Sequence, residues 1–123
     1  MEEMRDFTKL DVWQRAHYLV LDVYRVTDRY PLDERFELRS QTRRAATSVP
    51  MNIAEGAARN TAADYARFID IAAGSTNELE YQLILGRDLG YLDQRSTSDL
   101  RDETRQIRSM LTALTKRIVP NRP

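Results

Sequence analysis

Apolar side chains recur along this chain at alternating spacings of four and three residues, which is the period of one face of an α-helix. Four successive segments show this pattern, and they predict helices at about residues 11–29, 34–59, 62–89 and 97–118. Only four glycines and four prolines are available for turns, which disfavours an all-β fold. Three short connections between four amphipathic helices predict an all-α, antiparallel up-down four-helix bundle.

The first predicted helix carries two adjacent apolar stripes. One stripe contains Val12, Ala16, Leu19, Val23, Val26 and Tyr30. The other contains Trp13, His17, Val20, Tyr24 and Thr27. Because a helix in a monomeric bundle needs a single face of this kind, the second stripe indicates contact with something beyond the bundle. Trp13, Val20 and Tyr24 are therefore the predicted oligomer interface.

Prolines end one predicted helix and interrupt another. Pro31 stops the first helix. Pro50 lies inside the second, where it removes an amide donor and crowds the carbonyl group of Ala46. We therefore expect a kink at Pro50, and a short loop at residues 49–53 between two helices is the alternative.

Polar residues at two of the connections predict where helices stop and start. Asn60 is a predicted left-handed stop after the second helix. Thr61 with Asp64 resembles a capping box that begins the third helix, with Asp in place of Glu. Ser96 with Asp99 repeats this signature before the fourth helix.

Composition limits the setting in which the chain works. With 123 residues it is long enough for one domain with a substantial core, which we assign to residues 1–123. It has no cysteine, which excludes a disulfide framework and a thiolate metal site. The charged N-terminal residues and the lack of an apolar run of about 20 residues disfavour a secretory signal and a membrane span. We therefore expect a cytoplasmic protein.

Two rows of arginines are candidate contacts to nucleic-acid phosphates. The chain has 19 basic and 19 acidic residues, so it is not coated in positive charge, but all its basic residues except Lys9 and Lys116 are arginines. Arginine suits phosphate pairing better than lysine does. The candidates are Arg35, Arg39 and Arg43 in the second helix and Arg105, between Arg101 and Arg108, in the fourth. The alternative is a pair of solvated faces, with Glu34, Glu37, Asp102 and Glu103 as acidic partners.

Polar residues of the second and third helices also recur at helical spacing. If the two rows face each other, they form a hydrogen-bonded network of Arg44, Asn52, Glu55, Ser75 and Glu78. A buried polar group without a partner costs about 1–3 kcal/mol, so such a network must be nearly complete. It would fix the register of the two helices, or it would form a ligand or nucleic-acid site. A solvated face without a network is the third possibility.

Motifs of known catalytic chemistry are absent from the sequence. His17 is the only histidine, and Arg15, two residues earlier, lies on a different helical face. There is no Glu-x-x-His pair for a di-iron centre, no phosphate-binding loop and no dinucleotide fingerprint. We therefore predict a protein that is not an enzyme. No catalytic, cofactor-binding or metal-ligating residue, no cofactor and no small-molecule substrate is assigned.

Five stretches of the sequence carry a specific resemblance. They are LDVWQRA at 10–16, FELRSQTRRAA at 36–46, SVPMNIAEG at 48–56, YARF at 65–68 and GSTNELE at 74–80. Their order resembles the bacterial four-helix-bundle family encoded by intervening sequences within 23S ribosomal RNA genes. The resemblance covers about residues 8–118. The five residues of the predicted polar network match the shared motif, and the resemblance gives them no catalytic role.

The resemblance implies an assembly and suggests a partner. Members of this family are up-down bundles that form homopentamers with a central channel, and their biochemical role is not established. A related protein, the accessory variability protein of diversity-generating retroelements, is a strongly basic pentamer that binds nucleic acid and a reverse transcriptase. This chain, by contrast, has no net charge. The leading hypothesis is a non-enzymatic, oligomeric RNA- or DNA-binding protein, and the alternative is a protein-interaction scaffold that binds no nucleic acid.

Overall fold

The computed structural model describes residues 5–122, which form four α-helices and contain no β-strand. The helices are α2 (Asp11–Thr27), α3 (Leu38–Ala57), α4 (Ala62–Asp88) and α5 (Gln94–Ile118), with short 3-10 helices η1 (Phe7–Lys9) and η2 (Leu32–Glu34). Residues 1–4 and 123, which include most of the charged N-terminal segment considered above, lie outside the described residues.

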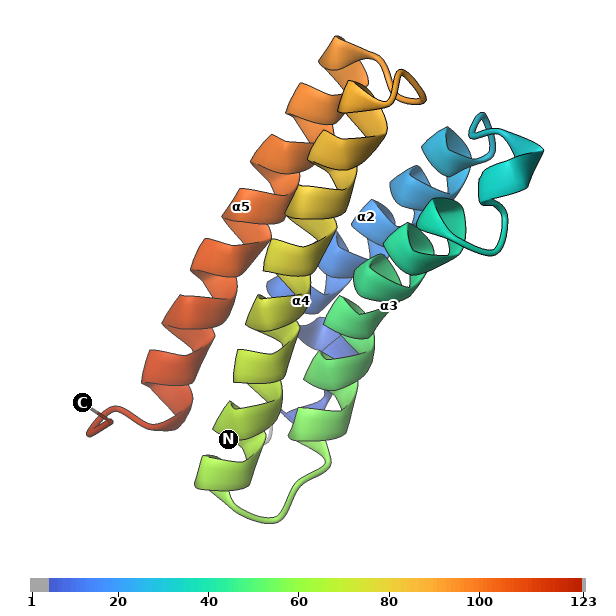
Figure 1. The fold of residues 1–123 in the computed structure, drawn as a ribbon. Coiled ribbons are helices and arrows are strands. Elements are labelled where there is room, and N and C mark those ends of the chain that lie inside the picture. The colour runs from blue at the N-terminus through green and yellow to red at the C-terminus, as the bar shows by residue number, and fades with distance from the viewer. Residues whose placement is uncertain (1–4, 123) are drawn as a thin grey trace.

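The four helices lie side by side, and each runs opposite to the next along the chain (Figure 1). Contacts connect α2 to α3, α3 to α4, α4 to α5 and α5 back to α2, and the α3–α4 pair has the most extensive interface. The predicted all-α, antiparallel up-down four-helix bundle is therefore confirmed. Both ends of the described chain lie at the same end of the bundle (Figure 1).

The core is built from apolar faces of all four helices. Its largest fully buried side chains include Leu19, Ile53, Tyr65, Ile69, Leu79, Leu83, Ile107 and Leu111. Small residues of α3 let α4 approach closely: a Cβ added to Gly56 would lie 3.0 Å from the Phe68 Cβ atom. This close approach explains why α3 and α4 share the largest interface.

The second helix begins later than predicted. Residues 34–37 do not join α3, because η2 and a turn reverse the chain after Pro31, and Glu37 has a non-helical backbone (φ −117°, ψ −107°). Glu34 is instead used as a tertiary contact, and its Oε2 atom accepts a hydrogen bond from the Tyr91 hydroxyl at 2.8 Å. The α3 helix then continues without a break through Pro50, so the alternative of a loop at residues 49–53 is wrong.

Two of the three predicted helix-end signals, at Asn60 and Ser96, differ from the structure. The Thr61 cap is confirmed, since its hydroxyl accepts a hydrogen bond from the Asp64 amide at 3.1 Å. Asn60 is not left-handed, because Gly90 is the only residue with positive φ in the described chain. The fourth helix begins at Gln94 rather than 97, because the Asp93 carboxylate accepts from the Ser96 amide at 2.6 Å and adds a turn before the predicted start.

Candidate functional site

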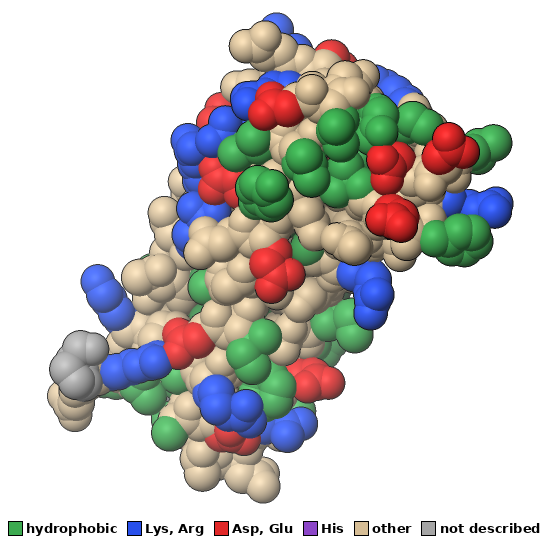
Figure 2. All heavy atoms as spheres, in the orientation of Figure 1, with side chains coloured by type: hydrophobic (Ala, Val, Ile, Leu, Met, Phe, Trp, Pro, Cys, Tyr) green, Lys and Arg blue, Asp and Glu red, His purple; other side chains and the backbone are tan. Residues whose placement is uncertain are grey.

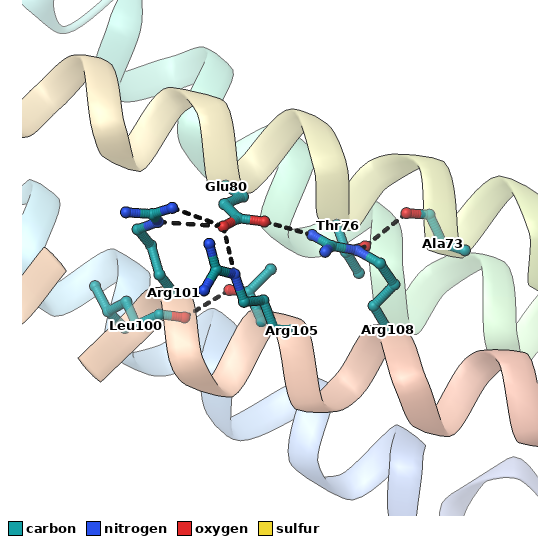
Figure 3. Close-up of polar contacts among 8 residues, drawn as sticks. Ala73, Thr76, Glu80, Leu100, Arg101, Arg105 and Arg108 are labelled. Carbon is teal, nitrogen blue, oxygen red and sulfur yellow. Dashed lines mark hydrogen bonds and ion pairs between the residues drawn. The ribbon is translucent and has the colours of Figure 1, made fainter. Parts of the chain in front are cut away.

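Three arginines of α5 converge on one carboxylate of α4 (Figure 3). The Glu80 side chain is 13% exposed and lies between the two helices. Its Oε2 atom is 3.1 Å from Arg101 Nη2 and accepts a hydrogen bond from Arg105 Nε at 2.8 Å. Its Oε1 atom accepts a hydrogen bond from Arg108 Nη2 at 2.7 Å. Glu80, Arg101, Arg105 and Arg108 are called the arginine cluster below.

The helices hold two of these arginines firmly and leave the third more open. Arg108 Nε also donates to the buried Thr76 hydroxyl at 3.0 Å, and that hydroxyl donates to the Ala73 carbonyl at 2.6 Å. The Arg101 and Arg108 side chains are 24% and 29% exposed, whereas that of Arg105 is 54% exposed. Arg105 is therefore the member of the cluster that solvent and ligands reach most easily.

The cluster keeps its carboxylate ionised and has a surplus of positive charge. Burial on its own would raise the pKa of Glu80, but hydrogen bonds from Arg108, Arg101 and Arg105 outweigh it, so the pKa lies below its ordinary value. Three guanidinium groups and one carboxylate leave two positive charges uncompensated within the cluster. Basic side chains, with acidic ones among them, lie along the upper left edge of the molecule, over α5 (Figure 2).

The acidic partners predicted for this row are not the ones that the structure uses. Glu103 faces α2 instead, where its carboxylate accepts from Arg15 Nε at 2.9 Å and from Arg15 Nη2 at 2.5 Å. Asp102 is exposed and has no ion pair within the described residues. Glu80 was missed because the sequence places it beside the α4 seam without indicating which neighbouring helix it faces.

The other predicted arginine row does not form a continuous surface. Arg35 precedes α3 and lies in the turn, with its guanidinium 4.6 Å from the centre of the Phe36 ring. Only Arg39 and Arg43 are on the helix, so the predicted four-residue spacing does not bring all three to one face. Arg39 is half-buried.

Arg43 is held by the neighbouring helix. Its guanidinium lies 4.4 Å from the centre of the Tyr24 ring and donates to the Thr27 hydroxyl at 2.8 Å. It also donates to the Tyr24 carbonyl and pairs with the Asp28 carboxylate at 2.8 Å. These contacts connect the start of α3 to the end of α2, so Arg43 has a structural role.

The predicted polar network is smaller than expected and is connected through Ser48. The hydroxyls of Ser48 and Ser75 are 2.8 Å apart across the α3–α4 interface. Asn52 Nδ2 donates to the Ser48 hydroxyl at 2.9 Å. The side chains of Arg44, Glu55 and Glu78 are exposed and make no hydrogen bond within residues 5–122. Arg44 and Glu55 instead line a shallow depression on the outer face of α3.

The exposed face of α2 shares only Tyr24 with the predicted interface. Val20 is buried in its own bundle, and Trp13 is half-buried against Phe7, with ring centres 5.1 Å apart. Tyr24 is 41% exposed, and the neighbouring exposed residues are Tyr18 at 65% and Leu21 at 48%. Tyr18, Leu21 and Tyr24 recur every three residues and form the exposed row of α2.

His17 and the acidic residues show no arrangement typical of a catalytic or metal site. The His17 ring is exposed and stacks on Trp13 with ring centres 5.4 Å apart. No group of three or more histidine, aspartate or glutamate side chains in the described chain is placed to hold a metal ion. None of its helices is long and apolar enough to cross a membrane.

The fold and the arginine cluster define a small helical-bundle protein with an arginine-rich α4–α5 face. The chain belongs to the 23S rRNA-intervening sequence protein family, whose sequence model matches residues 8–113. A structure with the same fold is that of a protein of unknown function from the S23 ribosomal protein family of Bacteroides thetaiotaomicron. The two share 22% sequence identity over 85% of this chain and 98% of the other, with a TM-score of 0.77. No curated protein matches this chain.

Proposed function

We propose that this chain is a non-enzymatic, homo-oligomeric binding protein that contacts the phosphates of RNA or DNA. The observation that supports this proposal is the arginine cluster, where three guanidinium groups share a single carboxylate. Guanidinium groups present several donors in a fixed plane and pair well with phosphate oxygens. A structural ion pair between α4 and α5 needs only one arginine, so the surplus of charge favours an external anion.

Assembly into a homo-oligomer would place several copies of the arginine cluster on one particle. A closed ring of identical subunits repeats the cluster once per subunit, so a polymeric anion that spans two copies gains avidity without any new contact. The exposed row of α2 supplies apolar area for such self-association. The number of subunits that we propose, five, follows from the family resemblance described above.

Binding across a series of salt concentrations tests the nucleic-acid proposal. A filter-binding assay with a structured fragment of 23S ribosomal RNA should give an affinity that falls steeply with salt, because each neutralised phosphate releases counterions. Duplex DNA of the same length serves as a comparison. Affinity that is weaker than micromolar at low salt, or that is insensitive to salt, contradicts the proposal. Light scattering on the same samples gives the mass of the particle with and without RNA.

A protein-interaction scaffold is the second candidate, and exposed apolar side chains favour it. Besides the exposed row of α2, Leu32 and Phe36 in the α2–α3 connection are 77% and 79% exposed. If the chain assembles but shows no salt-dependent affinity for RNA or DNA, the scaffold is preferred. A purified protein partner that stays bound after nuclease treatment, and that is lost on substitution of Phe36, would establish it.

The proposed absence of catalysis has a direct test. Prolonged incubation with the labelled RNA fragment should leave it intact. Cleavage that is lost when Glu55 or Glu78 is replaced by glutamine would show that the polar face of α3 and α4 is catalytic.

A further inference from the structure

We infer that Glu80 is an internal competitor for the phosphate group that the arginine cluster binds, and that Arg105 is the guanidinium that exchanges one anion for the other. The identity of the phosphate donor as a nucleic acid rests on the proposed function. The competition itself rests on the geometry of the cluster alone.

Glu80 occupies the place that a phosphate would take among these arginines. Its two oxygens accept from three guanidinium groups, and Oε2 is shared by Arg101 and Arg105. Phosphate oxygens are acceptors of the same charge type and take the same fork of donors. A phosphate that approaches the cluster therefore meets arginines whose best-placed donors are already occupied by a carboxylate.

Arg105 is the arginine that can leave with the smallest loss. It contacts Glu80 through Nε alone, and neither of its terminal amino groups has an acceptor among residues 5–122. A guanidinium carries five N–H donors, so most of the Arg105 hydrogen-bonding capacity is unused. Its side chain is also the most exposed of the three, and exposed ion pairs contribute little to stability.

Glu80 still has two arginine partners after the exchange. Arg101 and Arg108 keep Glu80 paired when Arg105 turns outward, and Arg108 stays anchored on the Thr76 hydroxyl. A phosphodiester held by Arg105 then reduces the surplus of the cluster from two positive charges to one. The Glu80 carboxylate nonetheless stays within a few ångströms of the bound phosphate and repels it, so Glu80 limits the affinity of the site.

Neutralising Glu80 should strengthen phosphate binding. In Glu80→Gln the repulsion disappears and all three arginines become available to the ligand. For charges about 6 Å apart near a wet surface, this corresponds to an affinity about three- to tenfold higher at low salt. The salt dependence should steepen by about one phosphate contact. Arg105→Gln should have the opposite effect on both measurements.

The matched control is Arg67→Gln. Like Arg105, Arg67 is exposed, and it pairs with Asp64 of its own helix at 2.9 Å. Its substitution by glutamine removes one positive charge, as Arg105→Gln does. It lies thirteen residues before Glu80 on α4, which is about 20 Å along the helix axis. The control should bind RNA within about twofold of the unsubstituted protein. An equal loss in Arg67→Gln and Arg105→Gln would show a diffuse charge effect and overturn the inference.

Inorganic pyrophosphate separates this inference from the proposed function. Its stabilisation of the protein against heat should be larger in Glu80→Gln than in the unsubstituted chain, and smallest in Arg105→Gln. If pyrophosphate stabilises the variants in this order but no RNA binds, the phosphate site is supported and the proposed nucleic-acid function is refuted. If RNA binds but Glu80→Gln binds it equally or more weakly, the nucleic-acid function stands and the competition is refuted.

A charge-matched variant keeps the test decisive if Glu80→Gln does not fold. The double substitution Glu80→Gln with Arg101→Gln removes the carboxylate together with one of its partners, so the cluster retains its two surplus charges. Circular dichroism checks that the variant is helical. Pyrophosphate and RNA should bind it at least as tightly as they bind the unsubstituted chain, and weaker binding would overturn the inference.

Discussion

At the scale of single residues, the contact between Tyr30 and Gly86 shows how tightly the core is packed. The Tyr30 side chain is 3% exposed, and its hydroxyl has no hydrogen-bond partner within the described residues. Burial raises the pKa of the Tyr30 phenol. The ring fits only because residue 86 is glycine, since a Cβ added there would overlap the Tyr30 hydroxyl. The hydroxyl is therefore a desolvated group that contributes no compensating contact.

Removing this hydroxyl should not harm the protein. Tyr30→Phe is expected to leave the free energy of unfolding unchanged or to raise it by up to about 1 kcal/mol, because a desolvation penalty is removed without the loss of a bond. Because the folded-state pKa of Tyr30 is raised, the unfolded chain ionises first and stability falls as the pH rises above about 10. Urea denaturation at neutral and alkaline pH should show a smaller alkaline loss in the variant. A clear loss of stability at neutral pH would reveal a partner for the hydroxyl.

Filling the space at residue 86 should have the opposite effect. Gly86→Ala forces its methyl group against the Tyr30 hydroxyl and should cost about 1–3 kcal/mol of stability, as overpacking does. Adding Tyr30→Phe removes the atom that clashes, so the double variant should recover part of the loss. Urea midpoints of the four proteins in this cycle measure the coupling. If the effects of Gly86→Ala and Tyr30→Phe on stability are additive, the added methyl group does not clash with the Tyr30 hydroxyl.

At the scale of helices, a small hydrogen-bonded group aligns α3 with α4. The Ser48 and Ser75 hydroxyls join the two helices, and the same Ser75 hydroxyl donates to the Ile71 carbonyl at 3.2 Å. Ser75 is 7% exposed, and its loss removes the hydrogen bond between the helices while Asn52 still donates to the Ser48 hydroxyl. The Ser48–Ser75 contact thus fixes the axial position of the two helices at one point along their interface.

Ser75→Ala should lower the free energy of unfolding by about 1 kcal/mol, which is typical for one buried hydrogen bond. Ser98→Ala on α5 is the control, since Ser98 is exposed and makes no side-chain hydrogen bond in the described chain. Chemical denaturation followed by circular dichroism measures both. Equal effects of the two substitutions would show that the Ser48–Ser75 contact contributes nothing.

Periodicity predicted the helices well because each one buries apolar residues that recur at helical spacing. It located their ends less well, because competing local signals are similar in sequence. Asp93 and Ser96 both suit an N-cap, and the structure uses Asp93. The segment from Glu34 to Glu37 has a sequence typical of a helix, but in the structure it belongs to the turn before α3. A residue beside a seam, such as Glu80, can face either neighbouring helix, so the arginine cluster required the structure.

At the scale of the whole molecule, the exposed row of α2 is the surface through which we propose that the subunits associate. Sequence reasoning found the second stripe of this helix, but it could not tell that Val20 belongs to the core while Tyr18 and Leu21 face outward. The difference arises because α2 packs against both α3 and α5, so its buried face is wider than a single seam. The exposed row is correspondingly shifted around the helix.

If the subunits associate through α2 as proposed, a charge placed in this row should dissociate them. Leu21→Glu puts a carboxylate among Tyr18 and Tyr24, where a second subunit would have to desolvate it. Light scattering should show a lower mass, while circular dichroism shows an unchanged helix content, because Leu21 is outside the core. Tyr81→Glu on α4 is the matched control, since Tyr81 is also exposed, at 61%. If Tyr81→Glu dissociates the particle and Leu21→Glu does not, the subunits meet through α4, and the arginine cluster then lies close to the interface instead of on an open face.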